Sequence, residues 1–150
     1  MIRRLLGCQK GNSLVEMGFD APILTTMIIG TVDLGMAYSA ELSLEQAAQR
    51  AIERVQREGY TTTQNSTLQS DAQTAAGSGS TATVTSWLEC NNDGVKLNFN
   101  TGVCATGVPY ARYVEVQVQK PFDPMFGRFF PGASNGGTVM LDATAGIRVH

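Results

Sequence analysis

Histidine is almost absent from this sequence. The only one is His150, the last residue, so the chain lacks the side chain that most often serves as a general base near neutral pH. It also has no Walker-type, phosphate-cradling glycine loop. The aspartates Asp71, Asp93, Asp123 and Asp142 are scattered, and no spacing pairs them. We therefore expect no catalytic residues, no enzymatic activity and no cofactor.

Charge is also sparse. Charged residues are 16% of the 150 residues, and the formal net charge is −2. Arg3, Arg4 and Lys10 lie in the first ten residues without any acid, whereas the part from Asn12 onward has 8 basic and 13 acidic residues and a net charge of −5. Because no basic cluster follows the first ten residues, we expect no nucleic-acid partner. The N-terminus is a distinct basic segment.

Cysteines are few and odd in number: Cys8, Cys90 and Cys104. If the basic leader were removed, Cys8 would leave with it and a pair 14 positions apart would remain. Such a pair suits one disulfide in an exported domain. Two buried free thiols are the alternative. A metal site is not expected, because two thiolates and a terminal histidine do not supply four zinc ligands.

Apolar periodicity predicts one long helix over residues 12–58. It is apolar over residues 21–40 and amphipathic afterwards, and Gly59 stands where a helix stop is expected. Residues 59–80 are rich in Thr, Ser, Gln and Gly, which fits a linker, although residues 67–76 have the spacing of a short helix. Residues 81–150 read as strands: "TATVTSWLEC", a hairpin signal "NNDG", "ARYVEVQVQKPF" and "TVMLDATAGIRV". The expected class is α+β, with a long N-terminal helix and a small antiparallel sheet on its outer half.

Three acids lie in or beside the apolar run: Glu16, Asp20 and Asp33. A secretory signal peptide cut near Ser39 or Ala40 is one interpretation, but the basic residues are separated from the apolar run by residues 12–20. A plain transmembrane anchor, with a span of about residues 18–40 and the basic leader in the cytoplasm, is another. It leaves the three acids unexplained.

The stretch "KGNSLVE" offers a third interpretation. A basic residue, Gly11, and a glutamate five positions later, Glu16, resemble the processing site of type IV prepilins, which a prepilin peptidase cuts after the glycine. The longer stretch to residue 55 resembles the TadE-like family, the minor pilins or pseudopilins of the tight-adherence (Flp) pilus. The shared features are Gly11, Val15-Glu16, Pro22, Asp33-Leu34-Gly35 and the Ala-rich continuation around Ala47. The chain departs from the family in having Met17, not an aromatic residue, directly after the glutamate, and in having Asp20.

The resemblance implies a membrane-inserted precursor in a bacterial inner membrane, with its C-terminal domain extracytoplasmic. It implies a leader of residues 1–11, a new N-terminus at Asn12, and partners that are a prepilin peptidase, other pilins and pilus assembly platform proteins. A membrane-anchored extracytoplasmic binding domain without a fibre role remains the alternative, and a secreted protein with a cleaved signal peptide is a further one.

Two residues of the apolar run have open roles. Asp33 is either an acid reaching water near the outer interface or a partner contact within the membrane. Pro22 is either a helix-start or kink residue or a fibre-packing residue. In the loop of residues 123–137, Phe126, Phe129 and Phe130 either plug the edge of the sheet or form an exposed aromatic patch.

Overall fold

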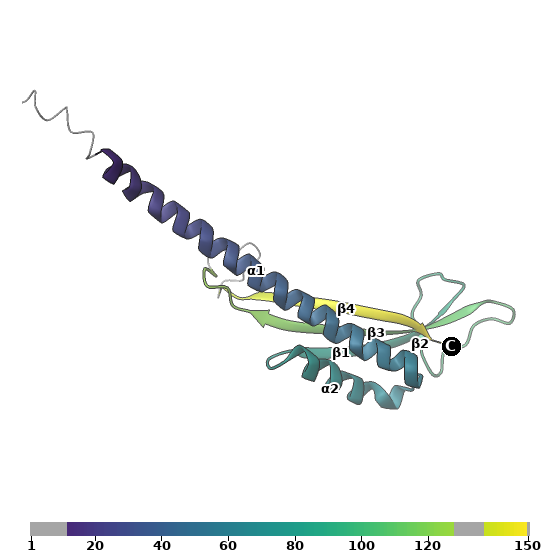
Figure 1. Ribbon diagram of the computed structural model, residues 1–150. Helices are drawn as coiled ribbons and strands as arrows, with labels where there is room; N and C mark the ends of the chain where they lie inside the picture. Colours follow the sequence, from purple (N-terminus) through teal and green to yellow (C-terminus); the bar gives the residue numbers. More distant parts are fainter. Residues whose placement is uncertain (1–11, 128–136, 150) are drawn as a thin grey trace, which may run out of the picture.

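The computed structural model describes residues 12–127 and 137–149. One long helix lies along a four-stranded antiparallel sheet and a shorter helix (Figure 1). The elements are helix α1 (Asn12–Glu58), a 3-10 turn η3 (Thr62–Gln64), helix α2 (Asn65–Ala76), and strands β1 (Thr81–Cys90), β2 (Leu97–Asn98), β3 (Tyr110–Phe122) and β4 (Val139–Val149). The expected α+β class is confirmed.

Helix α1 ends where the sequence predicts, just before Gly59. Gly59 has a φ of 78°, a left-handed conformation that glycine adopts without steric cost. Its amide donates a hydrogen bond of 3.0 Å to the carbonyl of Val55, which closes the last turn of the helix. The chain then reverses, so that α2 packs beside the end of α1.

The sheet has the strand order β2-β1-β3-β4, and every neighbouring pair is antiparallel. The expected hairpin is present, because β1 pairs with β2 through Trp87 with Asn98 and Leu88 with Leu97. Asn91 and Asn92 both have positive φ in the turn, as asparagine tolerates better than most residues. The hairpin's second strand, β2, has 2 residues.

The core lies between one face of this sheet and the two helices. Alternate residues of β3, namely Val114, Val116 and Val118, are fully buried and face the Leu44, Ala48 side of α1. Burying one valine side chain contributes about 1.5–3 kcal/mol. The further core residues are Ala47, Ala51, Ile52, Val55, Leu68, Ala72, Ala76, Ala82, Val84 and Ala143. Most helical members are alanines, which lets α1 lie close to the strands.

Residues 59–80 form η3 and α2 rather than a bare linker. The helix is longer than the pattern over residues 67–76 indicated, since it begins at Asn65. Leu68, Ala72 and Ala76 are its buried residues. The contact with α1 and the sheet therefore stabilises a segment whose composition is that of a loop.

Candidate functional site

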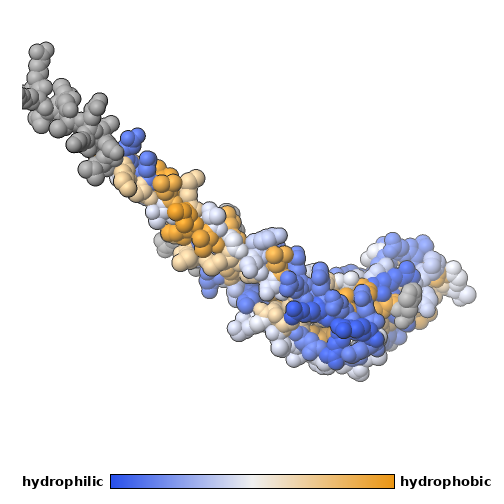
Figure 2. Space-filling view, in the orientation of Figure 1, coloured by the Kyte–Doolittle hydropathy of each residue, from blue (hydrophilic) through white to orange (hydrophobic). Residues whose placement is uncertain are grey.

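Helix α1 consists of two halves with different surroundings. Figure 2 shows apolar residues gathered on the part of α1 that projects beyond the sheet, while hydrophilic residues cover the domain. Large side chains there are exposed on every side of the helix, and a helix that is apolar all round requires an apolar environment. The exposed large hydrophobic residues of α1 are Val15, Met17, Phe19, Ile23, Leu24, Met27, Ile28, Val32, Leu34, Met36, Tyr38 and Leu42.

The three threonine hydroxyls in this half are satisfied within the helix. The hydroxyl of Thr25 donates to the carbonyl of Ala21 at 2.7 Å, and the hydroxyl of Thr31 donates to Met27 at 2.8 Å. Thr26 donates in the same way to Ile23. Internal pairing of this kind is what a lipid environment demands, because hydrocarbon offers no other partner. The helix is long and apolar enough to cross a membrane.

Pro22 lies inside α1, ten positions after its first residue. Pro22 is therefore not a helix-start residue, while a kink at this position stays a prediction. Proline lacks the amide that would bond the carbonyl four positions earlier, that of Gly18. A role of Pro22 in fibre packing stays a prediction.

The three acids have different environments. Glu16 and Asp20 are exposed on the first half of α1. Asp33 is only 1% exposed, and its two carboxylate oxygens each accept a hydrogen bond of 3.0 Å, from the backbone amides of Met125 and Phe126. Asp33 thus has its partners in its own chain, in the turn that follows β3. The two hydrogen bonds from successive amides replace part of the hydration that burial removes from this carboxyl group.

The processing motif lies only partly within the described residues. Gly11 and the leader of residues 1–11 are outside them, and Asn12 is the first residue of α1. Glu16 is one helical turn further on, on the same helix. The roles of Gly11, Asn12 and Glu16 in processing stay predictions.

The aromatic loop is described up to Gly127. Phe126 is 40% exposed and Met125 is 72% exposed, so both side chains remain accessible while their amides bind Asp33. Phe129 and Phe130 lie outside the described residues. At Phe126 the loop therefore presents an apolar surface next to α1, rather than a plug that is wholly covered.

Cys90 and Cys104 form a disulfide, with their Cα atoms 5.7 Å apart. The bond joins the end of β1 to the loop before β3, and it closes the segment that contains the β1–β2 hairpin. The expected pairing is present. The bond lies far from the apolar half of α1 in the sequence. It lies within the domain that is expected to be exported.

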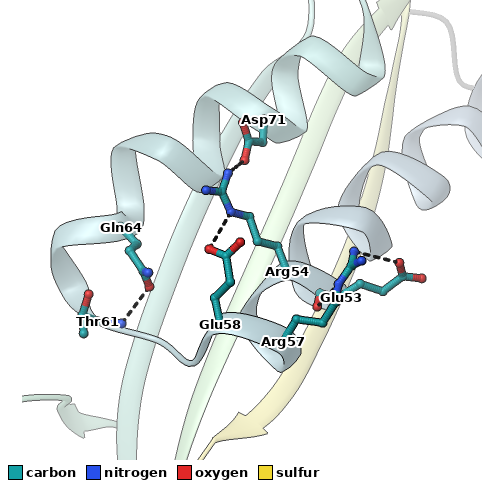
Figure 3. Close-up of polar contacts among 7 residues, drawn as sticks. All are labelled: Glu53, Arg54, Arg57, Glu58, Thr61, Gln64 and Asp71. Atoms are coloured by element: carbon teal, nitrogen blue, oxygen red, sulfur yellow. Dashed lines mark hydrogen bonds and ion pairs between the residues drawn. The ribbon is translucent and has the colours of Figure 1, made fainter.

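A group of ion pairs joins α1 to α2 (Figure 3). Arg54 donates to Glu58 at 3.1 Å on its own helix and also to Asp71 on α2. These two carboxylates, Glu58 first, raise the pKa of Arg54 above its ordinary value. Arg57 approaches Glu53 at 3.8 Å on the same surface. The Arg54–Asp71 pair was not predicted from the sequence, and the signals for the group were the four-residue spacings of Arg54 with Glu58 and of Glu53 with Arg57.

The opposite face of the sheet is largely polar, but it carries the exposed Met140 and an aromatic pair. Trp87 stacks on Tyr113 with ring centroids 5.6 Å apart, and the Lys96 ammonium lies 3.9 Å from the Trp87 ring centre. Among residues 12–127 and 137–149, no three His, Cys, Asp or Glu side chains gather in a way that would hold a metal ion.

These features define a class: a small α+β domain carried on the second half of a helix whose exposed, apolar first half fits a membrane anchor. Residues 11–52 match the family model described as TadE-like protein, which confirms the resemblance drawn from the sequence. The matched segment runs from Gly11 to the middle of the buried half of α1. No curated protein and no solved structure matches the chain.

Proposed function

We propose that this chain is a minor pilin, or pseudopilin, that takes part in assembling a tight-adherence pilus in a bacterial inner membrane. The proposal is carried by one observation: three features occupy the same segment of the chain. The TadE-like match over residues 11–52 contains both the glycine-to-glutamate motif and the apolar half of α1, whose large side chains are exposed. An exposed apolar helix suits first a lipid bilayer and then the helical core of a fibre.

In this proposal the chain is made as a precursor and a prepilin peptidase cuts it between Gly11 and Asn12. Cutting creates a free ammonium at the start of α1. The Glu16 carboxylate, one turn away, is then available to the ammonium of a neighbouring subunit. Charges are tolerated in an apolar fibre core when they are paired, whereas an unpaired charge is strongly unfavourable.

The orientation follows from charge and redox chemistry. The basic leader with Arg3, Arg4 and Lys10 stays in the cytoplasm, in keeping with the positive-inside rule. The sheet and α2 then lie outside the cytoplasm, where the Cys90–Cys104 disulfide is stable. The pilins and platform proteins that meet the chain do so through the apolar half of α1.

The mature N-terminus tests the processing step. Intact-mass and N-terminal peptide analysis of membrane-extracted protein should give a chain that begins at Asn12. Gly11→Ala should leave the leader attached. Gly18→Ala is the matched control, since an added Cβ at Gly18 meets no atom within 4 Å. A mature chain that begins near residues 39–41 would instead support a signal peptide and contradict the pilin assignment.

Association with the pilus tests the role itself. The processed chain should co-purify with the other pilins and with platform proteins after mild detergent extraction. A chain that is inserted but never co-purifies with them would support the membrane-anchored binding domain.

A further inference from the structure

The turn after β3 contacts α1 at Asp33, near the middle of the helix. Figure 1 shows the end of β3 and the start of β4 lying beside the middle of α1. Before Leu44, the helix side chains with reduced exposure are Ile29, which is half-buried, Asp33 and Ala37, which are buried, and Ala40. Ile29, Asp33 and Ala37 are spaced four apart and form one covered strip, and the hydrogen bonds from Met125 and Phe126 place the turn against its centre.

The turn cannot lie in hydrocarbon. Residues 123–127 are neither helix nor paired strand, and the Asp123 side chain is exposed, with one oxygen accepting a hydrogen bond of 2.6 Å from the Thr138 hydroxyl. Irregular backbone does not occur in contact with lipid tails, because its polar groups have no partners there. The hydrocarbon layer must therefore end near Asp33. The span of residues 18–40 expected from hydropathy would place the turn inside it.

Counting back about 20 residues from Asp33 gives a span that begins near the first residue of α1. Asp20 then lies deeper than the hydropathy-based span implied. Glu16 and Asp20, both exposed, then lie within the hydrocarbon layer, where an acid costs at most about 2.5–3.5 kcal/mol on insertion scales. An immersed turn is less favourable still, because several backbone groups and Asp123 would all lose their contact with water.

We propose that Asp33 and residues 123–127 mark the outer boundary of the membrane span, and that Met125 and Phe126 rest on the phospholipid headgroup layer there. Asp33 acts as a positioning residue, because it holds the turn by the backbone and leaves the two apolar side chains exposed. The surface is continuous with the exposed apolar part of α1, and this continuity indicates lipid as its partner. The inference rests on the proposed membrane insertion, not on the pilus role.

Thiol labelling locates the boundary. Single cysteines replace Leu24, Tyr38 or Ser43, all exposed, in a Cys8→Ser background whose Cys90–Cys104 disulfide is intact. The full chain is inserted into vesicles without other pilins and treated from the outer side with a membrane-impermeant maleimide. Tyr38→Cys should react at about the rate of Ser43→Cys, and at least about tenfold faster than Leu24→Cys, because thiolates form and react in water. Protection of Tyr38→Cys at the level of Leu24→Cys would overturn the boundary.

Lipid contact of the turn is tested by fluorescence. Phe126→Trp is combined with Trp87→Phe, which leaves one indole, and the protein is inserted into vesicles that contain lipids brominated near the headgroup or near the chain ends. Quenching should be stronger with the shallow bromines, and Asp33→Ala should weaken it while Asp20→Ala should not. Absence of quenching, stronger quenching by the deep bromines, or no effect of Asp33→Ala would each overturn the proposal.

The failures are distinguishable. If alkaline carbonate washes the protein off the vesicles, the protein is not inserted in the membrane, and the proposed function is overturned as well. Protein that stays inserted but shows a protected Tyr38→Cys overturns only this inference. Burial of the turn by a second copy of the chain would appear as quenching that is lost when the protein-to-lipid ratio rises, and it too would count against lipid as the partner.

Discussion

Asp33 and Met125 are 92 positions apart in the sequence, yet the Met125 amide donates a hydrogen bond of 3.0 Å to the Asp33 carboxylate. The other carboxylate oxygen accepts from Phe126 at the same distance. The contact joins the exposed half of α1 to the end of β3, whereas the buried half of α1 is held by apolar packing. It therefore fixes how far along the helix the domain extends.

Loss of this carboxylate should free the two amides. Asp33→Ala removes the acceptors of both part-buried hydrogen bonds. Losing a hydrogen bond to a charged group costs about 1.5–3 kcal/mol, which corresponds to roughly tenfold faster exchange or more if the turn opens locally. The exchange rates of the Met125 and Phe126 amides, measured in detergent-solubilised protein, test this prediction. Asp33→Asn keeps one acceptor oxygen, so its exchange rates should lie between those of the parent chain and of Asp33→Ala. Asp20→Ala should leave the exchange rates unchanged. Unchanged protection in Asp33→Ala would show that the contact contributes little.

The packing of α1 predicts a contrast between two leucines two positions apart. Leu44 is 1% exposed and Leu42 is 38% exposed. Leu44→Ala should destabilise the domain by about 2–5 kcal/mol, because it removes apolar contacts and leaves a cavity. Leu42→Ala should stay within about 0.5 kcal/mol, as is usual for surface sites. Urea unfolding followed by the fluorescence of Trp87 measures both, and equal effects would contradict the assigned face of the helix.

The disulfide should stabilise the domain measurably. In the chain-entropy model a bridge that closes about 15 residues contributes about 3 kcal/mol. The double variant Cys90→Ser with Cys104→Ser should lose that amount in urea unfolding, while Cys8→Ser should not change stability. Non-reducing peptide mapping of protein from membranes should recover the linked peptides. Two freely alkylated thiols there would contradict an oxidising location.

The ion pairs of Arg54 should be sensitive to salt rather than to pH. The pKa of Arg54 is raised by Glu58 and Asp71, so its stabilising effect is complete below the unfolded pKa and is lost only as the pH rises through the folded one. The guanidinium therefore stays charged throughout the neutral range. Asp71→Asn should lower the melting temperature slightly at low salt, and the difference should vanish at about 1 M salt, where the screening length is about 3 Å. A difference that persists at high salt would indicate a packing effect.

The sequence predicts the elements of this fold better than their contacts. The alternation of Val114, Val116 and Val118 with polar residues marks the central strand, and Gly59 marks the end of α1, because both signals are local. Helix α2 was less certain, since its residues resemble a loop and its stability comes from packing on α1. The β1–β2 hairpin was predicted from "NNDG", where two asparagines take positive φ.

In the candidate site, too, the residues could be predicted from the sequence but their contacts could not. The acids of the apolar run were recognised, but the partners of Asp33 were not, because backbone amides have no side-chain identity and these lie 92 and 93 positions away. The pair of Arg54 with Asp71 was missed for a related reason. Exposed ion pairs between two helices depend on how the helices cross, and local spacing does not specify that angle.

Glu16 should matter for assembly more than for insertion. It is exposed on α1 one turn after Asn12, and the first turn of α1 contains no acid. In an isolated subunit the carboxylate can stay near the watery inner interface, where an acid costs little. In a fibre the same position is surrounded by apolar helices, and a carboxylate there needs a positive partner, for which the processed terminus of a neighbour is suited.

We therefore predict that Glu16→Ala is inserted and cut like the parent chain but fails to co-purify with the other pilins. Glu16→Gln tests whether the charge is required, because the amide keeps the size and the hydrogen-bonding groups but cannot neutralise an ammonium; it should fail as well. Asp20→Asn, an exposed acid on the same segment of α1, is the control for lost negative charge and should assemble. Membrane fractionation, intact mass and co-purification give the three readouts. Normal assembly of Glu16→Gln would remove the pairing argument, whereas an uncut Glu16→Ala would make Glu16 chiefly a recognition residue for the peptidase.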